Sequence, residues 1–320
     1  MDILSDVLTT LRLHSSLYFR AEFGGTWSAR VPRDPNTVRF HLLLQGECWV
    51  EIPGSLKPTL MTAGDVILIP HGAEQILSDV AGRPPMDLPQ ILEMVKFDGS
   101  GPLSVGVRPG ERFTRMICGF CRFDPGADHP LLRALPAAIL VRASENLGEA
   151  WLADALRYMS YESHSDLPGA GAILDRLADI VLIQGVRSLL SASEGGTGFI
   201  AALRDHTLSR ALAAIHAKPE RDWTVDLLAR EAGLSRSRFA ELFTARLGMP
   251  VARYLAEWRL QKARKLLSDT RLSVAEIAHR VGYESLPSFT RRFTRQFGIG
   301  PGRFRRDGLG LATPEQAAAA

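Results

Sequence analysis

Residues Ser273 to Arg306 read SVAEIAHRVGYESLPSFTRRFTRQFGIGPGRFRR and have the pattern of a helix-turn-helix unit. Ser273 and Glu276 have the Ser-x-x-Glu spacing of a capping box, which predicts that a helix begins there. Gly282 is expected to end this helix, because glycine enters the left-handed C-cap conformation without a steric cost. A second helix is expected from about Leu286 to Phe297. Two helices joined by a glycine turn are typical of the helix-turn-helix.

The predicted second helix has an aromatic face and an arginine-rich face. Phe289, Phe293 and Phe297 recur every fourth residue, which places them on one buried stripe. The other positions are mostly polar or basic, namely Thr290, Arg291, Arg292, Thr294 and Arg295. A helix of this kind after a short capped helix favours a recognition helix for the DNA major groove.

The stretch has a second copy upstream, which reads TVDLLAREAGLSRSRFAELFTARLGMPVARYL from Thr224. Thr224 precedes Ser273 by 49 residues, whereas Phe243 precedes Phe293 by 50, so the later copy has one extra residue in its turn. Two such units make a chance pair of helices a poor explanation. The repeat therefore predicts a domain built from two helix-turn-helix units.

The segment from about Leu203 to Arg306 resembles the DNA-binding domain of AraC/XylS-type transcription regulators. The shared features are Ile277-Ala278, Gly282-Tyr283, Phe289 with Phe293, Phe297-Gly298 and Pro301-x-x-Phe304-Arg305. The resemblance implies a bacterial-type transcription regulator, an activator or a repressor. It also implies that double-stranded DNA and RNA polymerase are its partners.

The charge distribution agrees with a polyanion partner for the C-terminal part. Residues 203–306 contain 21 Lys and Arg against 10 Asp and Glu, whereas residues 1–202 contain 17 against 23. A basic region beside an acidic one is typical of a nucleic-acid-binding module joined to a different domain. The sequence has 3 cysteines, no secretory signal pattern and no apolar run long enough to span a bilayer, so we expect a cytoplasmic protein.

The first 125 residues predict many short strands separated by Gly and Pro turns, as in a sandwich or barrel. The expected strands are Leu17 to Phe23, Val38 to Leu44, Cys48 to Ile52, Val66 to Ile69, Gln90 to Phe97, Leu103 to Val107 and Phe113 to Phe123. The phrases FHLLLQGECWVEIPG (40–54) and LMTAGDVILIPHGAEQILSD (60–79) resemble the cupin sensor domain of one AraC-family branch. That resemblance implies a small jelly-roll barrel that holds a small-molecule effector.

A helical hairpin is expected after the barrel, because apolar residues fall at helical spacing on both sides of Asp166-Leu-Pro-Gly. The family resemblance implies a homodimer formed through 150–190, whereas the alternative is that these helices only cover an open face of the barrel. The expected fold class is α+β: an N-terminal cupin-like β-barrel with a helical hairpin, and an all-α C-terminal domain of two helix-turn-helix units joined by a long helix. The expected domains are 1–195 for sensing and dimerisation, 196–203 as a linker, 204–306 for DNA binding and 307–320 as a tail.

The outward positions of the two recognition helices are the candidates for contacts to DNA. Base-reading candidates are Arg236, Ser237, Ala240, Glu241, Leu286, Pro287, Thr290 and Arg291. Phosphate candidates are Arg238, Arg246, Arg292, Arg295, Arg303 and Arg305. Pro287 is tolerable in a first turn, but it offers no hydrogen bond to a base. A connecting helix over Pro250 to Ser268 would span roughly 28 Å, near the roughly 34 Å of one DNA turn.

Candidate effector and metal residues are sparse in the barrel. His41, Trp49 and His71 are the candidates for an effector pocket, and His71, Cys118 and Cys121 are the candidates for a metal site. Metal-binding cupins usually offer a His-x-His pair with a later Glu and His, and this set is incomplete here. Cys118 and Cys121 lie three apart, so joint ligation needs a bulge, which Gly119 could supply; redox sensing and buried structural thiols are the alternatives.

The sequence predicts no particular cofactor and no catalytic residue. Two other functions remain open at this point. One is a cupin metalloenzyme, an oxygenase or isomerase, fused to a DNA-binding module. The other is a constitutive DNA-binding dimer without an effector.

Overall fold

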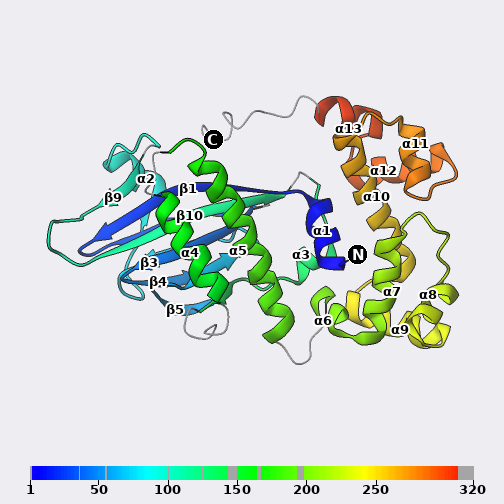
Figure 1. Cartoon of the computed structure of the whole chain (residues 1–320), viewed down its shortest axis with the longest axis horizontal. Helices are drawn as coiled ribbons and strands as arrows, with labels where there is room; N and C mark the ends of the chain where they lie inside the picture. Colours follow the sequence, from blue (N-terminus) through cyan, green and yellow to red (C-terminus); the bar gives the residue numbers. More distant parts are fainter. Residues whose placement is uncertain are drawn as a thin grey trace. The chain divides into compact units, whose positions relative to one another are not determined.

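The computed structural model describes residues 2–35, 37–54, 56–99, 101–123, 126–142, 150–163, 167–192 and 198–308 (Figure 1). The chain folds into two compact units. Leu13–Pro125 and Leu135–Ser193 form one, which we call the barrel unit. Met1–Arg12, Gly126–Ala134 and Glu194–Ala320 form the other, which we call the helical unit. The expected α+β class is confirmed, and each unit is discontinuous in sequence.

The barrel unit consists of two sheets. The first has the strand order β11-β6-β3-β10-β1-β9 and the second β5-β4-β7-β2-β8, and neighbouring strands are mostly antiparallel. The strands are β1 Leu13–Gly24, β2 Ser28–Val31, β3 Thr37–Gln45, β4 Glu47–Ile52, β5 Leu56–Thr62, β6 Val66–Ile69, β7 Gln75–Ser78, β8 Met86–Asp87, β9 Pro102–Val105, β10 Phe113–Phe123 and β11 Ile139–Val141.

Both faces of the six-stranded sheet are covered. Leu43 and Ile67 belong to the core cluster of the barrel, whereas Phe40 and Leu68 alternate with them and are also buried. Helices α4 (Ala150–Ser163) and α5 (Ala170–Ala192) pack along this sheet (Figure 1). Gly185 permits the close approach of α5, because an added Cβ would lie 2.2 Å from Cδ1 of Leu68. The predicted hairpin is therefore present and covers the barrel.

Two predictions for the N-terminal half are corrected. Residues 90–97 do not form a strand, because α2 occupies Leu88–Met94. Pro89 explains the difference: it fits the first turn of a helix and cannot donate to a sheet ladder. Residues 1–125 are also not wholly β, since α1 forms over Ile3–Leu11 with Asp2 as its N-cap.

The helical unit contains both predicted helix-turn-helix units. Its C-terminal helices are α6 Phe199–Arg204, α7 His206–Ala217, α8 Val225–Ala232, α9 Arg236–Leu247, α10 Val251–Asp269, α11 Val274–Arg280, α12 Leu286–Phe297 and α13 Pro301–Gly308. The capping box of Ser273 and Glu276 is present, and Gly282 has a φ of 86°. Helix α10 joins the two helix-turn-helix units as one continuous helix (Figure 1).

Each helix-turn-helix unit is held together by its own pair of phenylalanines. Phe239 and Phe243 are fully buried in the first unit, with ring centroids 5.7 Å apart. Phe289 and Phe293 hold the same places in the second, with centroids 5.6 Å apart. Since burial of such a ring contributes on the order of 2–3 kcal/mol, these pairs fix which faces of α9 and α12 remain outside.

Two short helices of the N-terminal half complete the helical unit. They are α1 and α3 (Pro130–Ala134), and they pack on α7 and α10 and on α6, respectively. Val7 and Leu11 of α1 and Leu131 of α3 are 0% exposed. Among the helices that the structure describes, none combines the length and the hydropathy needed to cross a membrane.

Candidate nucleic-acid interface

Helix α9 presents its N-terminal turns to solvent. Gly233, at φ 71°, ends α8, and the Ser235 hydroxyl caps α9 by accepting from the backbone N–H of Arg238. Arg236, Ser237 and Glu241 are exposed and Ala240 is half-buried, while Phe239 faces the core. The four predicted base-reading residues of the first unit therefore lie on the surface away from that core.

Helix α12 repeats this arrangement with different side chains. Ser285 caps it, and Pro287 occupies the first turn, where its missing N–H costs nothing. Leu286 is 41% exposed, Pro287 and Arg291 are exposed, and Thr290 is half-buried. The reading end of α12 thus offers an apolar contact and an arginine, whereas that of α9 is mostly polar.

Two of the three arginines of α9 are paired with acids. Arg236 Nη1 lies 3.2 Å from Asp226 Oδ2, and Arg238 Nη1 lies 3.3 Å from Glu241 Oε2. Both pairs are well exposed, so each contributes only about 0.2–1 kcal/mol and can open. Arg291, by contrast, makes no ion pair within the described residues.

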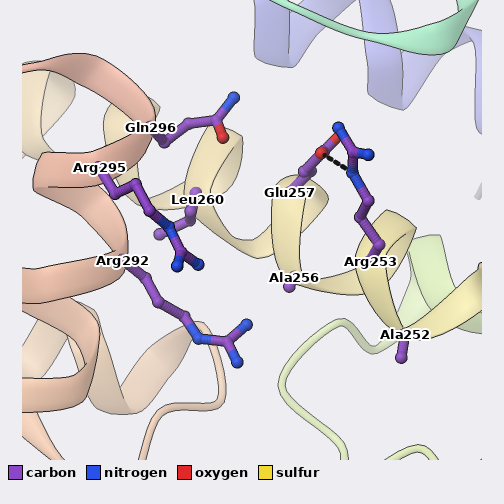
Figure 2. Close-up of a pocket in the computed structure, with 8 residues that line it drawn as sticks. All are labelled: Ala252, Arg253, Ala256, Glu257, Leu260, Arg292, Arg295 and Gln296. Carbon is purple, nitrogen blue, oxygen red and sulfur yellow. Dashed lines mark hydrogen bonds and ion pairs between the residues drawn. The ribbon is translucent and has the colours of Figure 1, made fainter. Parts of the chain in front are cut away.

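A basic cleft lies between α10 and α12 (Figure 2). It encloses about 490 Å³, and Arg292 and Arg295 point across it from α12 toward α10. On the opposite wall, Arg253 Nε donates to Glu257 Oε1 at 2.7 Å. Three arginines against one glutamate give the cleft a positive charge, which suits a phosphate group. Arg253 was not among the sequence candidates, although it is an arginine on the exposed face of the connecting helix.

The remaining phosphate candidates differ in exposure. Arg303 on α13 is exposed, whereas Arg246 at the end of α9 and Arg305 on α13 are half-buried. Helix α13 packs against α10 and α12, so Arg303 and Arg305 belong to the second unit. Basic side chains therefore gather more densely on the second unit than on the first.

The barrel unit holds a buried polar cluster around His41. His41 Nδ1 lies 3.1 Å from Cys118 Sγ, and Gln75 Nε2 lies 3.1 Å from His41 Nε2. Since the amide of Gln75 donates to Nε2, the ring proton is on Nδ1 and donates to the sulfur. Burial, with a smaller effect of Arg39, lowers the pKa of His41 to about 3. His41 is therefore neutral.

The other effector and metal candidates are not brought together with His41. Trp49 alternates on β4 with Cys48 and Val50, which belong to the barrel core, so its ring lies on the opposite face. His71 is exposed and donates from Nε2 to the Leu135 carbonyl at 2.9 Å. No described group of three His, Cys, Asp or Glu side chains has the arrangement of a metal site.

The cysteines are buried thiols. Cys118 lies opposite His41 and Cys121 lies opposite Val38 in the β10–β3 ladder, and the register is unbroken between these two positions. The side chains of the two cysteines therefore point to opposite faces of β10. The irregularity beside Gly119 lies in β1, between Leu17 and Phe19, and not in β10 as expected. Burial raises the pKa of Cys48 to about 12 and also raises the pKa of Cys118. Thiols that stay protonated react slowly, which favours the structural interpretation.

Comparisons with known proteins cover nearly the whole chain. Residues 2–191 match the cupin family, and residues 228–307 match a helix-turn-helix domain family. The HTH-type transcriptional regulator AlkR of Acinetobacter baylyi is 31% identical over 96% of this chain and 99% of its own length. A putative AraC-like transcription regulator of Streptomyces lividans is also 31% identical, over 96% of this chain and 98% of its own.

Among solved structures, the chain is similar to an AraC-type DNA-binding domain protein from Chromobacterium violaceum. The two are 30% identical, and the match covers 33% of this chain and 95% of that one, with a TM-score of 0.32.

Proposed function

We propose, on the premise that this chain belongs to the AraC-like transcription regulators with an N-terminal cupin domain, that it reads DNA with α9 and α12 under the control of a small effector bound in the barrel. The observation that carries this proposal is the duplicated helix-turn-helix on one rigid helix. Both recognition helices are capped, and both keep their first turns exposed. RNA polymerase is proposed as the protein partner of the DNA-bound regulator. The proposed location of the protein is the cytoplasm.

The two recognition helices are assigned to successive major grooves on one face of the duplex. Direct base contacts are proposed for Arg236, Ser237, Ala240 and Glu241 of α9, and for Leu286, Pro287, Thr290 and Arg291 of α12. Among these residues, Arg291 is the best supported for a base contact. It is exposed and has no ion pair in the described part of the chain, and an arginine can bind guanine through two hydrogen bonds. Phosphates are assigned to Arg238, Arg246, Arg292, Arg295, Arg303 and Arg305, with Arg253 added from the cleft.

Selection of DNA by the full chain tests this proposal. The purified protein is incubated with a random duplex library at fixed salt, and bound fragments are sequenced. The expected result is two short motifs with centres about 10–10.5 base pairs apart. The double variant Arg236→Ala/Arg291→Ala should lose information in both motifs. Bound fragments with the same composition as the input library would contradict the proposal.

For the effector, we propose the interior of the barrel beside His41 and Gln75. The Oε1 of Gln75 is buried and has no hydrogen-bond partner within the described residues, so it can accept a hydrogen bond from a ligand donor. Exposure of the protein to a library of small compounds, with the melting temperature as readout, should find one that raises it and also changes affinity for the selected DNA. The variant Gln75→Leu should abolish both effects, and a compound that changes only one of them would contradict control through this site.

A homodimer through residues 150–190 remains part of the proposal. Helix α5 buries Leu174 and Val181 but leaves Ile173 and Ile180 44% and 43% exposed. On α4, Tyr158 and Tyr161 are 59% and 63% exposed. Large exposed side chains of this kind mark interaction surfaces, and sedimentation at micromolar concentration should show a dimer that Ile180→Asp dissociates. Within 1–195 we assign sensing and dimerisation to the residues of the barrel unit, and we assign the linker to 196–203 and DNA binding to 204–306, with no catalytic activity.

A further inference from the structure

A chain of hydrogen bonds crosses the interior of the helical unit and joins four segments. His216 Nδ1 on α7 lies 2.9 Å from Asp6 Oδ2 on α1, and His216 Nε2 lies 2.7 Å from the Tyr254 hydroxyl on α10. The same hydroxyl lies 3.1 Å from His129 Nε2, in the segment Gly126–Ala134. Two of these four segments, α1 and 126–134, come from the N-terminal half of the chain.

The proton positions along this chain follow from its two ends. The backbone N–H of Leu131 donates to His129 Nδ1 at 3.1 Å, so a neutral His129 carries its proton on Nε2 and donates it to Tyr254. The Tyr254 O–H then donates to His216 Nε2. His216 Nδ1–H finally donates to the Asp6 carboxylate. Every donor meets an acceptor, and a fully satisfied buried network of this kind holds its members in one arrangement.

The segment 126–134 contacts the second helix-turn-helix unit directly, and it contacts α6 and α10, which pack against α9 of the first unit. At its first residue, the Gly126 carbonyl accepts from Gln261 Nε2 at 3.2 Å, and a Cβ added to Gly126 would lie 3.2 Å from Cδ1 of Phe297 in the second unit. Three residues later, the His129 ring packs edge-on against Phe199 and Trp258, at 4.6 and 5.3 Å between centroids. The segment therefore spans from Phe297 of the second unit to α6, which packs against α9 of the first unit.

Helix α1 lies along α10. Asp6 forms an ion pair with Lys262 near the middle of α10, in addition to its bond to His216. Arg12, at the other end of α1, forms an ion pair with Asp269, the last residue of α10. Helix α1 is thus fixed to α7, to the centre of α10 and to its end.

We propose that α1 and residues 126–134 act as a splint, which holds the two helix-turn-helix units at one fixed orientation and so sets the separation of the two half-sites that the protein accepts. Asp6, His129, Tyr254 and His216 are its positioning residues. The splint rests on the proposed function, since it presupposes that both units contact DNA. The splint goes beyond the proposed function, because none of the splint residues lies on the reading faces of α9 and α12.

The splint also has a direct covalent link to the barrel. Helix α1 ends at Leu11 and β1 begins at Leu13, while β10 ends at Phe123, just before the segment 126–134. Leu13 and Phe123 are register partners in the β1–β10 ladder. Both parts of the splint therefore adjoin, in sequence, the paired ends of β1 and β10.

Binding to spacing variants tests the splint. The probes are the duplex selected by the wild-type protein and the same duplex with one or two base pairs inserted between its half-sites. We expect the wild-type affinity to fall at least tenfold on insertion. For Asp6→Asn and Tyr254→Phe, which keep the side-chain shapes, we expect affinity for the parent duplex to fall about threefold and the penalty for insertion to shrink below threefold. The control Thr9→Ala, at an exposed position of α1, should behave as wild type.

The outcomes separate this inference from the proposed function. If the wild-type protein discriminates spacing and both variants discriminate it equally well, the splint is wrong and DNA reading by two units stands. If the wild-type protein selects no duplex, the proposed function itself fails. A loss of affinity in the variants with an unchanged insertion penalty also contradicts the splint, because that pattern indicates only a loss of folded protein.

A distance measurement without DNA provides a second test. Thr244 and Thr294 occupy equivalent exposed positions of α9 and α12, and spin labels on cysteines placed there report the separation of the two units by pulsed electron resonance. The labelled wild-type chain should give one narrow distance distribution, and Asp6→Asn should broaden it. An equally narrow distribution in Asp6→Asn and His129→Ala would overturn the splint.

Discussion

The two helix-turn-helix units share a scaffold and differ in what surrounds it. Their phenylalanine pairs are equally buried and almost equally spaced, at 5.7 and 5.6 Å. The first unit adjoins the buried chain of Asp6, His216, Tyr254 and His129, and acids hold its exposed arginines Arg236 and Arg238. The second unit has an unpaired Arg291 within the described residues and the arginine-lined cleft. The two units thus have equivalent cores and different surfaces.

The largest effect is expected from removing a core phenylalanine. Phe239→Ala and Phe289→Ala should each lower the free energy of unfolding by about 3–5 kcal/mol, because each leaves a cavity in a fully buried aromatic pair. Urea unfolding followed by circular dichroism measures this loss. The control Leu286→Ala removes a side chain that is 41% exposed, and its cost should be far smaller. If Phe239→Ala and Phe289→Ala differed severalfold in cost, the two cores would not be equivalent.

The next largest effect is a dependence of stability on pH, which is expected from the buried histidines beside the first helix-turn-helix unit. Burial lowers the pKa of His129 and of His216, while bonds to His216 and Lys262 lower the pKa of Asp6 despite its burial. An unfolded histidine has a pKa of about 6.5, so the unfolded chain takes up protons first as the pH falls below that value. The helical unit should therefore be fully stable above about pH 6.5 and lose stability below it, by about 1.4 kcal/mol per histidine for each pKa unit of difference.

Melting temperatures between pH 8 and 5 measure this dependence. The charged groups around the two histidines are Asp6, Lys262 and, at the surface nearby, Asp128 and Arg133. His216→Gln should flatten the profile, whereas His279→Gln should not, because His279 is an exposed histidine on α11 of the second unit. A profile in His216→Gln as steep as that of the wild type would show that the buried chain is not its cause.

Base reading by the second unit is the next smaller effect. Arg291→Ala should weaken binding to the selected duplex by roughly 1–3 kcal/mol and relax one base position. Fluorescence anisotropy against a panel of single-base changes measures both quantities. Equal losses on selected and random DNA would contradict the assignment of Arg291.

Arg303→Ala serves as the matched control for Arg291. Arg303 is exposed on α13, and as a phosphate contact it should weaken all sequences alike and reduce the slope of log affinity against log salt by about 1. A change of base preference in Arg303→Ala would move that residue to the reading group.

The smallest effect concerns the paired arginine of the first unit. Asp226→Ala frees Arg236 from its exposed ion pair, and since such pairs contribute about 0.2–1 kcal/mol, DNA affinity should rise by a similar amount. In the second unit the exposed Arg291 has no ion pair among the described residues, so this change leaves an unpaired exposed arginine on the recognition helix of each unit. An unchanged affinity would indicate that Asp226 also positions Arg236 for its base.

Local sequence signals predicted the helix-turn-helix units well. The capping box of Ser273 and Glu276, the glycine turn at Gly282 and the phenylalanine spacing each depend on neighbours within one or two helical turns, and all three are present. The strands β3, β4, β6 and β10 were recognised for the same reason. Residues 90–97 were misread as a strand because their apolar pattern is short, and Pro89 decides for a helix.

The surroundings of the two units were not predictable from local patterns. Asp6 and His216 are 210 residues apart in sequence, and Arg12 and Asp269 are 257 apart. No spacing rule links such positions, and an isolated Asp or His in an apolar helix resembles many others. The pairing of Arg236 with Asp226 likewise depends on how α8 and α9 cross, and the isolated position of Trp49 depends on which face of β4 the barrel encloses.

The discontinuous helical unit has a consequence for biosynthesis. During translation α1 leaves the ribosome long before α7 and α10, to which it binds. At about 5–20 residues per second, the delay until Asp269 is made amounts to roughly 10 to 50 seconds. Val7 and Leu11, which are 0% exposed in the finished protein, lack α7 until Ala217 has been made and lack the complete α10 until Asp269 has been made. The nascent chain therefore exposes the apolar face of α1, and a chaperone can bind that face until the last helices are made.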